Sequence, residues 1–338
     1  MPIYFIITPV RNEGQYLQKT IDSVVAQTLR PQKWIIVNDG STDQTSLLID
    51  AAATQHSWIQ AVHRADRGFR KSGGGVIEAF YDGYRLVQSA ECKVQSAEGN
   101  TSPRPSPQSG EGARNVECER EHTTPSPLPS DGRGIKGEGW DFLVKLDGDL
   151  SFEADYFEKC FQRFEAEPKL GIGGGRVYCR VNGQTEEDSP RDPAFHVRGA
   201  TKIYRRATWD AIGGLVKTPG WDTLDEVKAN MLGWKTYSFK ELKALQLKPT
   251  GAADGAWSNW VKNGRANYIS GYHPLFMLCK CAKRVLEKPV LIASAGLFYG
   301  YLKACLKAVP RVADPDLIRY LRRQQICRLL FRPSLWRS

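Results

Sequence analysis

Two aspartates one residue apart, Asp147 and Asp149, are the residues of this chain best suited to chemistry. They follow the apolar run Phe142–Leu146, which is of strand type, and so they are expected at the carboxyl end of a strand. Ligands of open α/β sheets bind at that edge. Carboxylate oxygens suit a hard divalent cation, and Mg²⁺ commonly combines one or two protein carboxylates with substrate phosphates. Aspartate pairs in turns are common, so their neighbours decide the interpretation.

Polar groups also follow the first two expected strands. Thr8-Pro9 and then Glu13 come after the first apolar run, and Asp39 comes directly after the second. Because the carboxyl ends of parallel strands meet at one edge, these groups and the aspartate pair are expected to face one crevice. Asp39 has a competing interpretation as an Asx turn or helix cap. Glu13 has one as an acidic residue that stabilises a helix N-terminus.

A later acidic group, Asp222, Asp225 and Glu226, opens an expected helix. Acidic side chains in a first helical turn are ordinarily partners of the helix dipole. A general base, however, needs only one carboxylate with suitable reach and pKa. Trp221 would desolvate Asp222 and raise its pKa. Asp222 is therefore the first candidate for a base, with Asp225 and Glu226 as alternates.

The segments that must position these residues alternate between strand and helix. Strands are expected at residues 4–7, 34–37, 59–62, 142–146, 171–178, 196–205 and 236–239. Helices are expected at residues 17–25, 47–53, 76–87, 154–167, 208–212 and 221–232, with a polar loop at 182–194. Such alternation predicts an α/β fold with a mixed, mainly parallel central sheet. Residues 1–245 would form the catalytic domain, and residues 246–338 a helical, basic region.

Residues 93–139 interrupt this alternation. They are rich in Pro, Gly, Ser and Glu and have almost no large apolar side chains. Such a segment cannot bury enough surface to offset its ordering entropy. We expect a disordered surface insertion that can be deleted with little effect on folding.

Composition and charge exclude several classes of protein. With 41% hydrophobic residues in 338, the chain is neither wholly disordered nor fibrous. The last 59 residues hold thirteen Lys and Arg against three acids and account for the whole net charge of +10. That distribution predicts a local anionic partner rather than a nucleic acid. Eight scattered cysteines and an N-terminus without signal-peptide features favour reduced thiols in the cytoplasm.

Three motifs together resemble the signature of family 2 glycosyltransferases with the GT-A fold. They are Ile7-Thr8-Pro9-Val10-Arg11-Asn12-Glu13, Val37-Asn38-Asp39-Gly40-Ser41-Thr42-Asp43 and Leu146-Asp147-Gly148-Asp149. Their order and spacing match the family apart from the insertion, over roughly residues 1–239. The run LDGDLSF resembles that of polyprenyl-phosphate sugar transferases of this family. Cell-surface glycan sugar transferases are the other kind of member that the chain resembles.

The acceptor half of that family is resembled by Gly213-Gly214 followed by Trp221-Asp222. The family usually has Glu-Asp, then a basic residue six positions and a glycine eleven positions further on. Lys228 and Gly233 fit that register from Asp222, although Trp221 replaces the usual Glu. The resemblance therefore favours Asp222 as the base.

The resemblance implies a role for each motif residue. The donor nucleotide would be held by Thr8, Pro9, Glu13, Asp39 and Asp147, and its phosphates contacted by Arg67, Arg70 or Lys71. Asp149, with Asp147, would bind Mg²⁺ or Mn²⁺ on the diphosphate. Asp222 would deprotonate the acceptor hydroxyl in a single displacement that inverts the anomeric carbon.

The implied function is metal-dependent transfer of a sugar from a nucleotide-diphosphate donor to a hydroxyl or phosphate acceptor. The acceptor would be lipid-linked or part of a cell-surface glycan, in cell wall or exopolysaccharide biosynthesis. A nucleotidyltransferase of similar fold and a catalytically silent, membrane-associated homologue stay open as alternatives. The Q-x-x-R-W pattern of processive polysaccharide synthases is missing, which argues against a polymerase.

The C-terminal region contains an uncharged run at residues 290–302. Its 13 residues fall short of the ~20 that a spanning helix needs, and a basic flank favours an interfacial or re-entrant helix. Each nearby arginine would contribute on the order of 1 kcal/mol at anionic lipid headgroups. These arginines are Arg311, Arg319, Arg322, Arg323, Arg328, Arg332 and Arg337. A run of this length suits a buried core equally well, so a peripheral position at the inner face of the cell membrane is one of two expectations.

Overall fold

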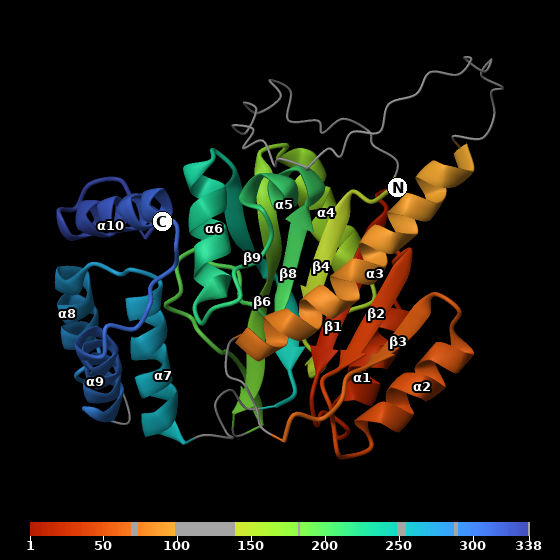
Figure 1. Cartoon of the computed structure of the whole chain (residues 1–338), viewed down its shortest axis with the longest axis horizontal. Helices are drawn as coiled ribbons and strands as arrows, with labels where there is room; N and C mark the ends of the chain where they lie inside the picture. Colours follow the sequence, from red (N-terminus) through yellow and green to blue (C-terminus); the bar gives the residue numbers. More distant parts are fainter. Residues whose placement is uncertain (69–73, 99–138, 182, 249–254, 287–289, 337–338) are drawn as a thin grey trace, which may run out of the picture.

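The computed structural model describes residues 1–68, 74–98, 139–181, 183–248, 255–286 and 290–336. They form one nine-stranded sheet with helices on both faces and a block of helices beyond α6 (Figure 1). No helix within these ranges is both long enough and apolar enough to cross a bilayer.

The sheet has the strand order β3-β2-β1-β4-β8-β6-β9-β5, with β7 paired to β6. Its strands are β1 Tyr4–Val10, β2 Lys33–Asn38, β3 Ile59–His63, β4 Phe142–Leu146, β5 Leu150–Ser151, β6 Leu170–Val181, β7 Gln184–Glu187, β8 Thr201–Arg205 and β9 Lys235–Gln246. The strands β1 to β4 are parallel, whereas β8 runs antiparallel to both β4 and β6. The carboxyl ends of β1, β2 and β4 therefore meet at one edge, and the predicted mixed, mainly parallel α/β sheet is confirmed.

Helices cover both faces of this sheet. They are α1 Leu17–Val25, α2 Thr45–Gln55, α3 Gly74–Glu98, α4 Tyr156–Ala166, α5 Arg206–Ile212 and α6 Trp221–Met231, followed by α7 Ala256–Ile269, α8 Pro274–Lys283, α9 Ile292–Leu306 and α10 Pro315–Leu329. Alternate side chains of a strand point to opposite faces, and β1 shows the result. Tyr4 and Ile6 pack in the core of α1, α2 and α4, whereas Phe5 and Ile7 pack in that of α3, α5 and α6.

A third core lies in the C-terminal block. Leu224 and Val227 of α6 pack there with Tyr268, Leu297 and Leu317, which come from α7, α9 and α10. Figure 1 shows these helices beside α6, away from β1, β2 and β3. Because α6 also contributes Trp221 and Ala229 to a sheet core, it joins the block to the sheet.

The predicted end of the first strand is wrong. Strand β1 continues through Thr8 and Pro9 to Val10, because its ladder with β2 reaches Asn38. Its ladder with β4 ends at Ile7, so Pro9 lies where β1 has a neighbouring strand on one side only.

Three other predicted boundaries also differ. The polar loop predicted at 182–194 contains β7, which pairs with β6 after a turn where Gly183 has a φ of 82°. The strand predicted at 196–205 begins only at Thr201, and residues 196–200 form turns and irregular backbone. Helix α3 continues to Glu98, since its sequence has neither Pro nor Gly between Gly83 and Gly99. Residues 93–98 of the predicted insertion are thus helical, and residues 99–138 lie outside the described residues.

Candidate active site

The aspartate pair and Asp39 meet at the end of β1. Asp147-Gly148-Asp149 form the turn between β4 and β5, and the backbone N–H of Asp39 donates to the carbonyl of Val10 at 2.8 Å. A Cβ atom on Gly148 would lie 2.3 Å from Cγ1 of Val10, so only glycine lets the turn pack against this strand. The predicted convergence of these groups at one sheet edge is therefore present.

Asp149 is the most deeply buried member of the pair, with 6% of its surface exposed. Its Oδ2 accepts a hydrogen bond from Nε2 of Gln246 at 3.1 Å. Burial and then the charge of Asp147 raise the pKa of Asp149 to about 7, against the opposing effect of that hydrogen bond. The charge of Glu13 raises it further, which indicates that Glu13 is also near. A bound cation would favour the ionised form of this carboxyl group.

The donor set fits a divalent cation that shares its coordination with a ligand. Among the described residues, no group of three or more His, Cys, Asp or Glu side chains could enclose a metal by itself. Two neighbouring carboxylates, one buried and one accessible, instead match a site that Mg²⁺ or Mn²⁺ completes with phosphate oxygens and water. Asp147 is the accessible one, with 32% of its side chain exposed.

A buried lysine fixes the orientation of Asp147. The Nζ atom of Lys145 pairs with Oδ1 of Asp147 and donates to the carbonyl oxygen of Gly199 at 2.5 Å. The backbone N–H of Asp147 also donates to the carbonyl of Ala200 at 2.8 Å. The segment 199–200 is therefore held against the end of β4 by both side-chain and backbone contacts.

The same segment brings Asp222 to the crevice. Asp222 lies in the first turn of α6, and its Cβ is 3.4 Å from the position that a Cβ on Gly199 would occupy. Lys145 also lies over the ring of Trp221, with Nζ 5.5 Å from the ring centroid. Asp147 and Asp222, 75 positions apart in the chain, are thus joined through Lys145 and Gly199.

Asp225 and Glu226, the alternate bases, point into the protein. Nζ of Lys202 lies 2.9 Å from Asp225 and 2.8 Å from Glu226, and all three side chains have almost no exposed surface. The hydroxyl of Tyr204 donates to Asp225 at 2.6 Å. Glu226 accepts from the backbone N–H of Val197 at 2.7 Å. Asp222 is partly exposed, so it is the member of the acidic group that a substrate can reach.

His196 completes this buried charge network. Its Nδ1 lies 2.8 Å from Oε2 of Glu226. Burial lowers the pKa of His196, but the charge and hydrogen bond of Glu226 outweigh burial, and the net pKa lies above the ordinary value. For Glu226, burial raises the pKa, and the charges of Lys202 and His196 oppose this shift without cancelling it. The network holds the first turns of α6 against β8 and the segment before it.

Asp39 is surrounded by arginines. Nη1 of Arg64 lies 2.5 Å from Oδ1 of Asp39, and Nη2 of Arg67 lies 2.6 Å from Oδ2. Arg67 also pairs with Glu78 at 2.9 Å, so it is held between two carboxylates rather than presented to a phosphate. Arg70 and Lys71, the other predicted phosphate contacts, lie outside the described residues.

The residues that follow the first apolar run are positioned in different ways. The Thr8 hydroxyl is fully buried and accepts a hydrogen bond from Nε1 of Trp34 at 2.9 Å, so it faces the core. Pro9 pairs with Val37 within the sheet. Glu13 reaches the crevice, where its Oε1 lies 2.8 Å from Nζ of Lys248.

Four polar residues of the site were absent from the sequence prediction: Lys145, Lys202, Gln246 and Lys248. The two strand lysines carried a usable signal, because a lysine inside a short apolar strand must have a buried partner. Gln246 and Lys248 carried none, because they reach the site from the far end of β9.

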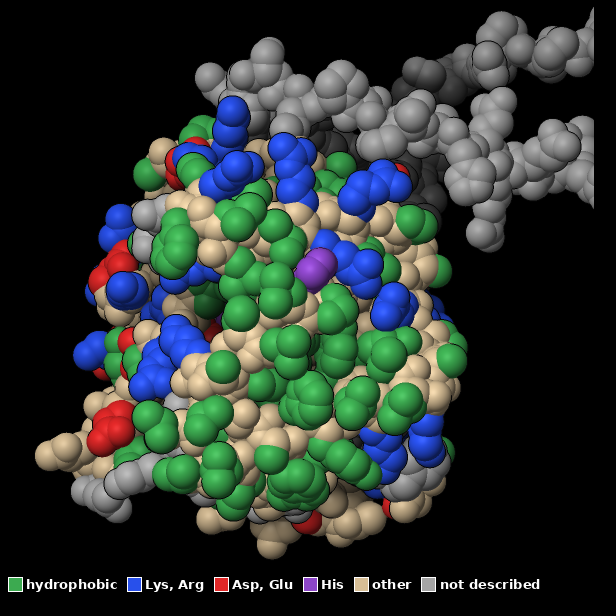
Figure 2. Space-filling model, turned by 90° about the vertical axis from the view of Figure 1, so that its left-hand side faces the viewer, with side chains coloured by type: hydrophobic (Ala, Val, Ile, Leu, Met, Phe, Trp, Pro, Cys, Tyr) green, Lys and Arg blue, Asp and Glu red, His purple; other side chains and the backbone are tan. Residues whose placement is uncertain are grey.

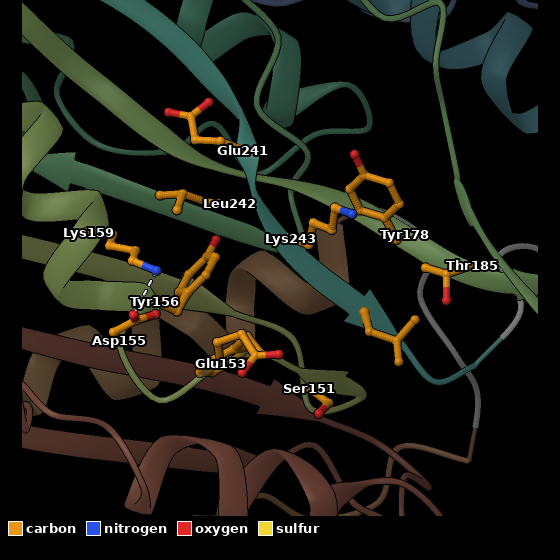
Figure 3. A pocket seen from close by; sticks show the side chains of 12 residues that line it. Ser151, Glu153, Asp155, Tyr156, Lys159, Tyr178, Thr185, Glu241, Leu242 and Lys243 are labelled. Carbon is orange, nitrogen blue, oxygen red and sulfur yellow. Dashed lines mark ion pairs between the residues drawn. The ribbon is translucent and has the colours of Figure 1, made fainter.

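A separate cavity of about 310 Å³ lies between β5, β6, β7, β9 and the start of α4. Figure 3 shows it, with Asp155 and Lys159 paired at 2.7 Å on its wall and Tyr178 and Lys243 opposite. None of the predicted site residues lines this cavity. It is therefore distinct from the group of Asp39, Asp147, Asp149 and Asp222 at the sheet edge, the aspartate crevice.

Comparison with known sequences finds relatives of part of the chain. Residues 5–75 match the family described as Glycosyl transferase family 2. The "Uncharacterized glycosyltransferase EpsJ" of Bacillus subtilis is 31% identical over 97 residues, which are 27% of this chain and 28% of that protein. The "Glycosyltransferase GlyG" of Streptococcus pneumoniae is 30% identical over 63 residues, 19% of this chain and 21% of that protein. The matched segments thus span less than a third of these relatives.

Comparison with solved structures agrees on the fold. The structure of GalNAc-T7 with UDP, GalNAc and Mn²⁺ has a TM-score of 0.52 and 10% identity, and the match covers 99% of this chain and 55% of that one. Identity at this level speaks for the fold alone. The match at residues 5–75 thus indicates a segment similar to glycosyl transferase family 2, and the architecture of the chain is that of the GT-A fold.

Proposed function

We propose that this protein is a metal-dependent, inverting glycosyltransferase that moves a sugar from a nucleotide-diphosphate donor to a hydroxyl or phosphate acceptor. One observation supports this most: a buried and an accessible carboxylate, Asp149 and Asp147, lie at a sheet edge and are linked through Lys145 and Gly199 to Asp222. A metal-binding pair and a reachable carboxylate are the two elements that such a transfer needs.

Asp149 and Asp147 would hold Mg²⁺ or Mn²⁺. The bound cation would stabilise the charge of the departing nucleoside diphosphate. The ion pair with Lys145 keeps Asp147 aimed at the crevice, and Gln246 does the same for Asp149. The GalNAc-T7 structure of similar fold contains Mn²⁺ and UDP, which is consistent with this assignment.

Asp222 would take the proton from the acceptor hydroxyl. It stands at the N-terminus of α6, partly exposed, while the neighbouring Asp225 and Glu226 are engaged with Lys202. We assign no covalent nucleophile, so transfer would occur in one displacement with inversion at the anomeric carbon. The buried network of Lys202, Asp225 and Glu226 holds the first turn of α6, and with it Asp222, in a fixed position.

The donor nucleotide would lie along the ends of β1 and β2. Each oxygen of Asp39 contacts one arginine, and a carboxylate has further lone pairs with which to accept from a base or ribose. Thr8 and Pro9 would act through their backbone, because the Thr8 hydroxyl is buried against Trp34. Glu13 would contact the donor from the start of α1, and Arg70 and Lys71 remain proposed contacts of its phosphates.

For the acceptor, we keep a lipid-linked or cell-surface glycan, in cell wall or exopolysaccharide biosynthesis at the inner face of the membrane. No nucleic-acid partner is proposed, because the sheet domain has no excess positive charge. The two other candidate functions, nucleotidyl transfer and a silent homologue, differ in their products rather than in their fold.

The products decide between these functions. The full chain is incubated with a panel of nucleotide sugars and Mn²⁺, with and without EDTA, and released nucleoside diphosphate and pyrophosphate are measured separately. Nucleoside diphosphate that appears only with the metal supports the proposal. Release of pyrophosphate points to nucleotidyl transfer. Absence of both, together with absence of thermal stabilisation by any donor, would mean that the chain is silent.

A further inference from the structure

Large apolar side chains gather on the outer side of the C-terminal block. Of the 18 such side chains that are exposed among the described residues, 10 lie between Leu275 and Leu306. Leu302 and Leu306 are 41% and 78% exposed on α9, and Leu275 and Leu278 are exposed on α8. Monomeric soluble proteins rarely expose a contiguous surface of this kind unless it binds something.

Helix α9 is apolar on both of its sides. Its inner side packs on α7 so closely that a Cβ on Gly300 would lie 2.1 Å from the carbonyl oxygen of Val261. Leu297 and Tyr301 complete that inner side. The outer side repeats at helical spacing through Phe298, Leu302 and Leu306, and Leu291, just before the helix, is exposed as well. Folding of the block is therefore complete without these outer side chains, which are left for a partner.

Positive charge borders this apolar face. Between Gly255 and Ala313 the sequence has nine Lys and Arg and a single acid, Glu287. Figure 2 shows green apolar side chains over the middle of this side of the molecule, with blue Lys and Arg around them. The next acids along the chain are paired: Asp314 with Lys228 at 3.4 Å and Asp316 with Arg319 at 2.8 Å.

Aromatic side chains lie at the border between the two. Trp257 and Tyr299 are both about half exposed, and their ring centroids are 5.9 Å apart. Nζ of Lys303 lies 5.3 Å from the ring of Tyr299. Trp, Tyr and Lys in one group are typical of the level of lipid headgroups, where one part of each side chain is apolar and the other is hydrated.

We propose that the outer side of α8 and α9 is a docking surface for an anionic lipid bilayer. The apolar side chains enter the level of the acyl chains, and the bordering Lys and Arg contact anionic headgroups. Charge selects this occupant over a second copy of the chain, because two such faces would bring their positive borders together. The segment lies on the bilayer rather than across it, in keeping with the length of its helices.

Docking would also place the active site relative to the membrane. Leu224 and Val227 of α6 are buried in the same core as Leu297 of α9. Asp222 lies at the start of that same α6, so the proposed base and the docking surface belong to one packed unit. The inference deepens the proposed position of the protein at the inner face of the membrane, but it does not rest on the proposed activity, since docking requires no turnover.

Flotation of the full chain with lipid vesicles tests the proposal. Vesicles of phosphatidylcholine and phosphatidylglycerol in equal parts should carry the protein upward, and pure phosphatidylcholine vesicles should carry far less. The double variant Leu302→Glu with Leu306→Glu should lower the bound fraction at least about tenfold. Leu47→Glu is the matched control, because Leu47 is 70% exposed on α2, far from this face, and it should bind like the wild type.

A second variant tests the proposal even if the first variant fails to fold. Lys303→Gln with Lys307→Gln alters only exposed side chains and should weaken binding to the anionic vesicles, with the circular dichroism spectrum unchanged. Equal binding of this variant and the wild type to anionic vesicles would overturn the proposal. So would absence of vesicle binding by a wild-type chain that is dimeric in light scattering, because the face would then be a contact between copies.

Discussion

The aspartate crevice and the C-terminal apolar face each contain side chains in an unfavourable environment. The crevice region buries ionisable groups, whereas the C-terminal face exposes apolar ones. At the crevice and in the network behind it, Asp149, Lys145 and Lys202 are ionisable side chains that are almost fully buried. On α8 and α9, leucine and phenylalanine side chains are exposed. A buried charge costs free energy unless it is paired, and an exposed apolar side chain gives up about 25 cal/mol for each Å² left in water. A ligand of opposite charge would stabilise an unpaired buried charge, and an apolar partner would remove the exposed apolar surface from water.

The ionisable groups of this region differ in how fully the protein itself pairs them. Lys202 has two carboxylate partners within 2.9 Å, and each of those has a further donor, so this group is complete within the protein. Asp149 has one amide donor from a side chain and two carboxylates nearby, and its pKa rises to about 7. We therefore interpret the Lys202 group as a structural network and Asp149 as part of the proposed binding site, and substitutions in each should separate the two in experiments.

The largest effect is expected from Asp149→Asn. Loss of one carboxylate of the proposed metal site should reduce turnover by about 10³-fold or more and remove metal-dependent binding of the donor. Folding should survive, because the amide keeps the shape and burial has already raised the pKa of this carboxyl to about 7, so that the folded protein also accommodates its neutral form. Product release and calorimetric titration with Mn²⁺ and nucleotide measure the two quantities.

Asp155→Asn is the matched control for that substitution. Asp155 also follows β5, but it pairs with Lys159 on the wall of the separate cavity (Figure 3). Its variant should keep wild-type turnover. If both variants were equally active, the crevice would not be the metal site.

A smaller effect on rate is expected from Asp222→Asn. Loss of the proposed general base should lower kcat by about 10²- to 10⁴-fold and leave the KM of the donor nearly unchanged. Asp210→Asn, at an exposed position of α5 paired loosely with Arg206 at 3.8 Å, is the control. An increase in donor KM without a change in kcat would assign Asp222 to donor binding instead.

The sequence predicted where the motif residues lie in the fold, because each of them is within a few positions of the strand that places it. Asp39 and Asp147 directly follow β2 and β4, and their positions required only the order of the strands. Lys248 could not be predicted, since it contacts Glu13 from 235 positions away through the pairing of β9 with β5. That proximity is a property of the sheet order rather than of any local pattern.

Two errors of the sequence interpretation have local physical causes. Phe195 and Val197 alternate with polar residues and resemble a strand, but Pro193 and Gly199 on either side favour turns, and β8 starts at Thr201. The hairpin of β6 and β7 was predictable, because Asn182-Gly183 is a common two-residue hairpin sequence.

The structural network is tested by Lys202→Met. Removing the cation leaves Asp225 and Glu226 buried without it, which should lower the free energy of unfolding by about 3–5 kcal/mol. Lys235→Met removes an exposed ion pair with Glu167, 2.6 Å apart, and should cost about 0–1 kcal/mol. Urea unfolding measures both. Equal, small losses would remove the distinction between the network and a surface pair.

The smallest effect is expected from the titration of His196 in the same network. Glu226, Asp192 and Asp222 hold its pKa above the ordinary value, in spite of its burial. A folded-state pKa that is raised means that the folded protein binds this proton more tightly, so the stabilisation is complete below about pH 6.5 and is lost as pH rises through the raised value. Glu226, whose pKa is also raised, acts in the same direction from a lower pH.

Substitution separates the histidine from the glutamate in that pH profile. In the wild type, Tm should fall as pH rises from slightly acidic to alkaline values, and His196→Gln should flatten the neutral part of this decline. The acidic part, which belongs to Glu226, should persist in the variant. Because a glutamine retains a hydrogen bond to Glu226 but has no proton to lose, an unchanged neutral slope would show that the decline comes from another group. The charge network behind Asp222 would then be insensitive to pH in this range.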